Sequence, residues 1–279
     1  MSSTLKSACA AVLALFSLPA ATWAAPVTST IYITVDNGVT NAIRTLNPLT
    51  GQFTLTCVFA TLRGQVFASL TVGNAGTIYG ASTNGNLYTV TTNGTATQLG
   101  TVSFASPGYF GLAYTGDGFV ADNDASAPFP LYAINSSGTI SSTIGQMLPS
   151  GYNNSGSLVY GPGNNLYLTA STGPAFPPNL YSVNTSTGAA TLIGGLGTNL
   201  LVLAYDGSTL FGVDGSVTSN IPVYSINTTT GVATPVSTIS GLPAGWEVDS
   251  AAAVPEPASL SLLAASGLLL LRRRRPSPN

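Results

Sequence analysis

The sequence contains no histidine and very little charge. Only 6% of its 279 residues are Asp, Glu, Lys or Arg, against about 25% in ordinary globular domains. Without histidine, the chain has no imidazole general base, no Ser-His-Asp triad and no His-ligated zinc site. It also lacks a Gly-x-Ser-x-Gly elbow and a phosphate-binding Gly-Lys-Ser/Thr loop. We therefore predict no catalytic residues and a protein that is not an enzyme.

Cysteine is almost as scarce, because the chain holds only Cys9 and Cys57. Cys9 lies in an N-terminal segment that we expect to be removed. Cys57 would then be alone, which excludes an intramolecular disulfide and a Cys-rich metal site. We interpret Cys57 as a buried thiol on a strand, since unpaired cysteines usually behave as small hydrophobic residues.

The central part of the chain also lacks cations. Lys6 and Arg272–Arg275 lie in the terminal segments, and only Arg44 and Arg63 remain between them. The same region carries eight acids and therefore a net charge of −6: Asp36, Asp117, Asp122, Asp124, Asp206, Asp214, Glu247 and Asp249. With no basic patch to neutralise phosphates, we predict no binding to nucleic acid.

Residues 1–24 resemble a secretory signal peptide. Lys6 supplies the positive charge, and Ala8–Leu18 is an apolar run too short to span a bilayer. Ala24 is a small residue at the expected cleavage position. Cys9 lies at the start of the apolar run, whereas a lipoprotein cysteine follows it, so we predict no lipid anchor.

Residues 25–254 are built from a repeated hairpin. Asn179–Ile193 combines two strand-like runs with the turn Thr185–Gly188, and Gly188 can adopt positive φ. Near-copies of this hairpin occur at Ala42–Leu55, Asn86–Leu99, Leu131–Ile144 and Val223–Val236. Matching positions, Arg44 and the tyrosines of the Leu-Tyr pairs, follow one another at spacings of 44, 44, 49 and 43 residues. A period near 44 with four strand-like runs is typical of propeller blades.

The repeats predict an all-β fold, a five-bladed β-propeller. The first period lacks its first strand, and Val248–Val254 is a strand-like run that follows the fifth period. We expect this run to complete the first blade and close the ring. The Leu-Tyr-x-Ile-Asn-x-x-x-Gly pattern resembles that of secreted β-propellers, without the Trp-Asp signature of WD40 repeats. A β-sandwich or a β-helix is the alternative.

Residues 255–279 change abruptly in composition. Pro255-Glu256-Pro257 is followed by an apolar run at 258–271 and then by Arg272, Arg273, Arg274 and Arg275. This order closely resembles the PEP-CTERM sorting signal of Gram-negative bacteria. A helix over 258–271 would span about 21 Å, and arginine side chains can reach across the remaining bilayer to the cytoplasmic side. A plain C-terminal membrane anchor would have the same orientation.

The resemblance to PEP-CTERM proteins implies an address and partners. It implies export by the secretion machinery, transient anchoring in the inner membrane, and processing by an exosortase. Delivery to the cell surface or to an exopolysaccharide matrix, as in a biofilm, would follow. Extracellular polysaccharide is then a further expected partner.

One set of residues is a candidate site. The second strand of each period ends in Asp36, Ser82, Asp122, Ser171 or Asp214, and Asp124 adds a carboxylate. In a propeller these positions emerge at one face, where they can form a polar ring. Oxygen ligands of this kind suit calcium, although strand-ending Asp is also ordinary turn chemistry. We expect no cofactor, and calcium is the one ion that this ring would suit.

Three functions remain open. The first is an adhesive, structural or carbohydrate-binding role without catalysis. The second is an extracellular hydrolase or lyase that uses carboxylates, since two carboxylates suffice for glycosidic chemistry. The third is a platform for protein interactions.

Overall fold

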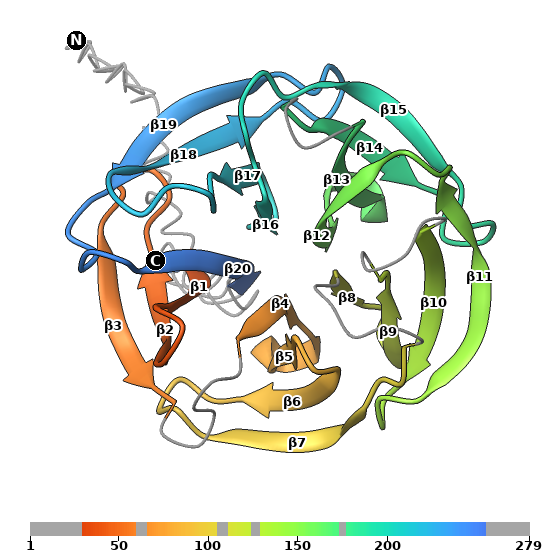
Figure 1. Ribbon diagram of the computed structural model, residues 1–279, viewed down its shortest axis with the longest axis horizontal. Coiled ribbons are helices and arrows are strands. Elements are labelled where there is room, and N and C mark those ends of the chain that lie inside the picture. The colour runs from red at the N-terminus through yellow and green to blue at the C-terminus, as the bar shows by residue number, and fades with distance from the viewer. Residues whose placement is uncertain (1–29, 60–65, 105–110, 124–128, 173–176, 255–279) are drawn as a thin grey trace, which may run out of the picture.

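The computed structural model describes residues 30–59, 66–104, 111–123, 129–172 and 177–254. The described residues form five four-stranded antiparallel sheets arranged as blades around a central axis (Figure 1). The predicted five-bladed β-propeller is therefore confirmed, and the alternatives of a β-sandwich and a β-helix are excluded. The leader at 1–24 and the tail at 255–279 lie outside the described residues.

Each blade has four strands that follow one another from the axis of the ring outward. Blade one comprises β20 (Glu247–Val254), β1 (Thr30–Asp36), β2 (Asn41–Leu46) and β3 (Phe53–Val58). Blade two comprises β4 (Phe67–Val72), β5 (Ile78–Ser82), β6 (Asn86–Val90) and β7 (Ala96–Thr101). Blade three comprises β8 (Leu112–Tyr114), β9 (Gly118–Ala121), β10 (Phe129–Asn135) and β11 (Ile140–Leu148). Blade four comprises β12 (Asn153–Tyr160), β13 (Leu166–Ser171), β14 (Asn179–Val183) and β15 (Ala190–Gly195). Blade five comprises β16 (Val202–Tyr205), β17 (Leu210–Val213), β18 (Ile221–Ile226) and β19 (Ala233–Ile239).

The turn between the third and fourth strands explains the repeated Asn-x-x-x-Gly pattern. In blade four the Asn184 side-chain oxygen accepts hydrogen bonds from the amides of Ser186 and Thr187 at 2.9 and 3.0 Å. Gly188 adopts φ +76° and donates its amide to the Asn184 carbonyl at 2.7 Å. Asn47 and Asn227 form matching turns in blades one and five. An Asn at the first position and a Gly at the last therefore set the tight return in blades one, four and five, whereas Thr91 occupies the first position in blade two.

The hydrophobic core is divided into five clusters, and each cluster joins two neighbouring blades. This arrangement buries both faces of the strands nearer the axis, so the second strand β17 is buried along its whole length while the outermost strand β3 is partly exposed. A blade is consequently stable only when it has a neighbour on each side. The propeller has no separate cores that fold independently of one another.

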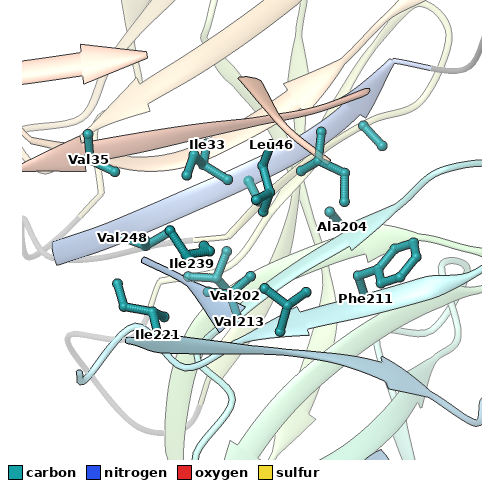
Figure 2. Close-up of a cluster of buried hydrophobic side chains, with 14 of the residues drawn as sticks. Ile33, Val35, Leu46, Val202, Ala204, Phe211, Val213, Ile221, Ile239 and Val248 are labelled. Carbon is teal, nitrogen blue, oxygen red and sulfur yellow. The ribbon is translucent and has the colours of Figure 1, made fainter. Parts of the chain in front are cut away.

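Closure of the ring occurs inside blade one. β20 pairs antiparallel with β1, and Thr30 lies opposite Val254 at one end of this pairing. The side chains of Ile33 and Val35 from β1, and Val248 from β20, pack against Val202 and Val213 of blade five (Figure 2). The C-terminal strand thus completes the first blade, as the missing first strand predicted.

Two small structures interrupt the repeat. The three-residue 3₁₀ turns η1 (Asn74–Gly76) and η2 (Pro162–Asn164) connect the first and second strands of blades two and four. Blades three and five use short turns around Asp117 and Asp206 at the same position. These connections all lie at the end of the ring where the inner strands finish.

Candidate functional site

The ring has two mouths with different chemistry. The second strands β1, β5, β9, β13 and β17 all run toward one end, which we call the carboxylate mouth. Asp36 ends β1, Asp122 and Asp214 immediately follow β9 and β17, and Ser82 and Ser171 end β5 and β13. The structure therefore places these five predicted residues at one mouth, while Asp124 lies outside the described residues.

Three of these carboxylates make bonds to nearby backbone. Asp36 accepts a hydrogen bond from the Gly38 amide at 2.6 Å, and Asp214 accepts from the Ser216 amide and hydroxyl at 3.1 and 2.6 Å. Asp122 is completely buried and accepts from the Gly111 amide. The bonds of Asp36 and Asp214, each made two residues along the chain, are ordinary turn chemistry, whereas that of Asp122 joins it to the residue before β8.

The described residues contain no group of three acidic, His or Cys side chains that could hold a metal ion. Calcium binding at this mouth stays a prediction, because Asp124 was one of its proposed ligands. A calcium titration that compares the melting temperature of the wild type with that of the triple variant Asp36→Asn, Asp122→Asn and Asp214→Asn would test it.

Sequence reasoning missed a second group of acids at the same mouth. Glu247 pairs with Asp36 across β20 and β1, and the register shifts between Thr34 and Val35. Asp249 is the additional residue of the resulting bulge, because Val35 pairs with Val248 and Thr34 with Ser250. The sequence signal was the pair of acids Glu247 and Asp249. They lie at the start of the C-terminal run that was expected to complete the first blade, next to the strand that ends in Asp36.

The bulge changes the ionisation of Asp249. Burial raises the pKa of Asp249 to about 9, with further contributions from a hydrogen bond to Asp36 and from repulsion by Asp36 and Glu247. Its Oδ2 atom is buried and makes no hydrogen bond to any residue that the structure describes. Asp249 therefore carries a proton at neutral pH, and it is a proton donor within a cluster of carboxyl groups.

The opposite end of the ring is the tyrosine mouth, where the inner strands finish. A hollow of about 250 Å³ lies there, lined by all five inner strands β4, β8, β12, β16 and β20. Tyr114, Tyr160 and Tyr205 stand at the last positions of β8, β12 and β16 and line it. We call this space the tyrosine hollow. The tyrosine that ends the inner strand in three of the five blades was its signal in the sequence. The ligand site predicted from the sequence lay at the carboxylate mouth instead.

Two chemically distinctive side chains lie away from both mouths. The Arg44 guanidinium carbon is 4.9 Å from the centre of the Phe53 ring and 5.7 Å from that of Trp246. Burial lowers the pKa of Arg44, and its Nε makes no hydrogen bond within the described part of the chain. Cys57 is a free thiol on β3. It was predicted to be buried, but it is only partly so.

None of the described helices is long and apolar enough to cross a membrane. The span predicted at 258–271 and the sorting motif at 255–257 lie outside the described residues. The span and the motif therefore stay predictions.

No protein-family model matches the chain, and no curated protein matches it. Among solved structures, TolB from Acinetobacter baumannii is 15% identical with a TM-score of 0.48, over 81% of this chain and 55% of TolB. The chain thus spans about half the length of that protein. A protein of unknown function from Bacteroides caccae is 9% identical with a TM-score of 0.45, over 82% of this chain and 100% of that one. An oligogalacturonate lyase in complex with manganese is 15% identical with a TM-score of 0.40, over 76% and 62%. At these values no activity, ligand or partner is transferred to this chain.

Proposed function

We propose that this chain is an exported, non-catalytic binding protein of the cell surface or exopolysaccharide matrix. The leader at 1–24 directs secretion, and an exosortase recognises the tail at 255–279. The propeller then has an adhesive, structural or carbohydrate-binding role outside the cell. Its body of neutral Gly, Ser, Thr and Asn residues with few charges suits that environment.

One observation carries this proposal: the ring is closed entirely within residues 30–254. Thr30 and Val254 are paired at one end of blade one. Both terminal segments therefore join the propeller at the same place, outside its strand pairing. Proteolytic removal of either segment would leave every blade with its four strands. A body of this kind is compatible with processing at both ends.

Two further features support a role without catalysis. The chain has no histidine, and Asp36, Asp122 and Asp214 accept hydrogen bonds from neighbouring backbone amides. These carboxylates are used by the fold. The proposed role therefore depends on surfaces for binding and requires no reactive group.

The sorting step can be tested by replacing the three residues of the motif. In a host that has an exosortase, the triple variant Pro255→Ala, Glu256→Ala, Pro257→Ala should stay in the inner membrane and keep its arginine cluster. The wild type should reach the surface without Met1 or Arg275, as measured by intact mass. The matched control Pro276→Ala with Pro278→Ala removes prolines outside the motif and should be processed normally. Normal processing of the triple variant, or a surface protein that retains both ends, would contradict the proposal.

A second candidate function is favoured by Asp249. A protonated carboxyl beside other carboxyl groups is the arrangement from which a general acid can be made, so a carboxylate-dependent hydrolase or lyase is the alternative. The buried position of Oδ2 weighs against it. Polysaccharide cleavage that is present in the wild type and abolished in Asp249→Asn would establish this alternative.

A further inference from the structure

The tyrosine hollow lies on the axis of the ring, because every inner strand contributes to it. Each inner strand is the terminal strand of its sheet, so one of its edges has no further strand beside it and its backbone groups face the channel. Figure 1 shows these five strands nearest the axis of the ring. With a volume of about 250 Å³, the hollow is slightly smaller than the pockets of ~300 Å³ or more that take drug-sized ligands. It therefore suits a single ring-sized group.

The lining restricts the charge of a ligand. Among the residues that the structure describes, it contains tyrosines, aliphatic residues, Gly161, Thr71 and Asn164, but no charged side chain. Asp117 and Asp206 lie in the turns that follow β8 and β16 at the same mouth. Within the described part of the chain, an anionic ligand would meet these carboxylates without a compensating cation in the lining, and a cation would find no carboxylate inside the hollow. Electrostatics therefore favours a neutral ligand.

The three tyrosines are not equivalent. The Tyr114 hydroxyl donates to the Gly116 carbonyl at 2.5 Å, and its ring stacks on Tyr79 with centroids 5.5 Å apart. The Tyr205 hydroxyl donates to the Gly207 carbonyl at 2.8 Å. Both rings are thereby fixed as walls of the hollow. Among the described residues, the Tyr160 hydroxyl makes no such bond, and burial raises its pKa. Tyr160 is thus a neutral phenol that can donate and accept hydrogen bonds.

The turn after Tyr160 contributes a second polar residue to the lining. Asn164 lines the hollow and has φ +60°, a left-handed backbone conformation that residues other than glycine rarely adopt. The corresponding position of the sister turn η1 is Gly76 with φ +77°. Asparagine tolerates this conformation better than most residues, and here it adds a donor and an acceptor at the mouth. Blade four therefore presents a phenol and an amide together.

We propose that the tyrosine hollow binds one ring of a neutral saccharide. The apolar C–H face of a sugar ring packs on tyrosine rings, which are amphipathic, and its hydroxyl groups both donate and accept hydrogen bonds. Tyr160 and Asn164 are the specificity-determining pair, and Tyr114 and Tyr205 form the walls. This inference rests on the carbohydrate-binding part of the proposed function and is independent of export and sorting.

The test uses the full chain and soluble neutral hexose oligosaccharides, with uronic acid oligosaccharides of the same length as the charged comparison. Calorimetric titration should show binding to a neutral oligosaccharide and none to the charged ones. Tyr160→Phe and Asn164→Gly should each weaken that binding by about three- to tenfold, since each removes hydrogen bonds to the ligand. Asn164→Gly also relieves the left-handed backbone, so its melting temperature should not fall.

Matched controls separate binding from folding. Asn220 also has positive φ, +50°, but it precedes β18 at the carboxylate mouth, so Asn220→Gly should bind like the wild type. Tyr132→Phe, on the third strand of blade three, should do the same. Three results would overturn the inference. They are equal affinity in wild type, Tyr160→Phe and Asn164→Gly, a preference for the uronic acid series, and no saccharide binding by the folded chain. An unprocessed tail with intact binding would overturn only the sorting proposal.

Discussion

Asp249 shows how one additional residue in a strand can set the ionisation of a side chain. Without the bulge, strict alternation along β20 would place residues 247 and 249 on the same face, as the partners of Asp36 and Thr34 of β1. The bulge instead removes Asp249 from the pairing and brings it against Asp36, with Glu247 close enough to repel it. Burial and repulsion both disfavour the charged form, so the carboxyl group retains its proton.

The replacement Asp249→Asn should stabilise the protein at neutral pH. In the unfolded chain Asp249 ionises near pH 4, whereas the folded pKa is about 9. For an acid with a raised pKa, stability is greatest below the unfolded pKa and is lost as the pH rises through the folded pKa. Asn cannot ionise but can still donate a hydrogen bond to Asp36. We expect the free energy of unfolding to rise by about 1–3 kcal/mol at pH 7.5, with little difference at pH 4.

Denaturant unfolding of both proteins between pH 4 and pH 9 measures this effect. Asp117→Asn is the matched control, because Asp117 is exposed in a turn and accepts only a 3.3 Å bond from Thr115. Its stability curve should follow that of the wild type. If the free energy of unfolding depends on pH in the same way in the wild type and in Asp249→Asn, then Asp249 is ionised in the folded protein.

The residue scale is also where sequence reasoning reaches its limit. The alternation of apolar and polar residues predicts that Asp36, Asp122 and Asp214 end strands, and the structure places them there. It cannot predict a bulge, because the register shift at Asp249 depends on how β20 meets a strand more than two hundred residues earlier in the chain. The tyrosine hollow was missed for a similar reason, since Tyr114, Tyr160 and Tyr205 converge only when the ring closes.

At the scale of single elements, the outermost strands share a feature. One small residue on each of them contacts the turn of the next blade, and we call this ring of contacts the belt. Each of these strands has a register shift followed by a small residue at the same position. The residues at this position in blades one to five are Cys57, Gly100, Gly145, Gly194 and Ser237. In blades two, three and four a Cβ at this glycine would overlap the turn of the next blade. In blade five the Ser237 hydroxyl donates to the Pro48 carbonyl of blade one at 2.5 Å.

The adjacent glycines of β15 allow the belt to be tested. Gly194→Ala would place its Cβ against the carbonyl oxygen and carbon of Thr230 in blade five. These are backbone atoms, which cannot move aside as a flexible side chain can. We expect a loss of about 1–3 kcal/mol, as for an overpacked core. Gly195→Ala is the matched control, since its Cβ would lie 3.4 Å from the nearest atom, Asn179 Oδ1. Its stability should change by less than about 0.5 kcal/mol.

Thermal and denaturant unfolding of the two variants gives the comparison directly. Equal stability of Gly194→Ala and Gly195→Ala would mean that the blades can separate at their outer edge without cost. The sequence predicted the turns that take part in the belt, through their Asn-x-x-x-Gly pattern. It did not predict the small residue on the neighbouring strand, because that residue matters only once two blades pack against each other.

At the scale of the whole molecule, the number of blades and the mode of closure were the parts that the sequence predicted best. Both depend on counting: five copies of a hairpin, one missing strand, and one strand left over at the end. The packing between the blades adds the physical reason. The cluster in Figure 2 joins blade one to blade five in the same way that the other clusters join their neighbours. The closing junction is therefore an ordinary interface between blades, made from the two ends of the body.

Loss of the closing strand should consequently affect the entire propeller. Deletion of residues 247–254 removes the partner of β1, exposes the apolar side of Ile31 and Ile33, and leaves blade five without a complete neighbour. We expect a fall in melting temperature of more than ~10 °C with a broadened transition, since a few kcal/mol already shift a domain of this size by that amount. Deletion of residues 255–279 is the matched control and should leave the transition unchanged. Should the first deletion fail to fold, Ala251→Asp keeps the strand and places a charge in the buried cluster. Calorimetry showing an unchanged cooperative transition in both closing-strand variants would mean that β20 contributes nothing to ring stability.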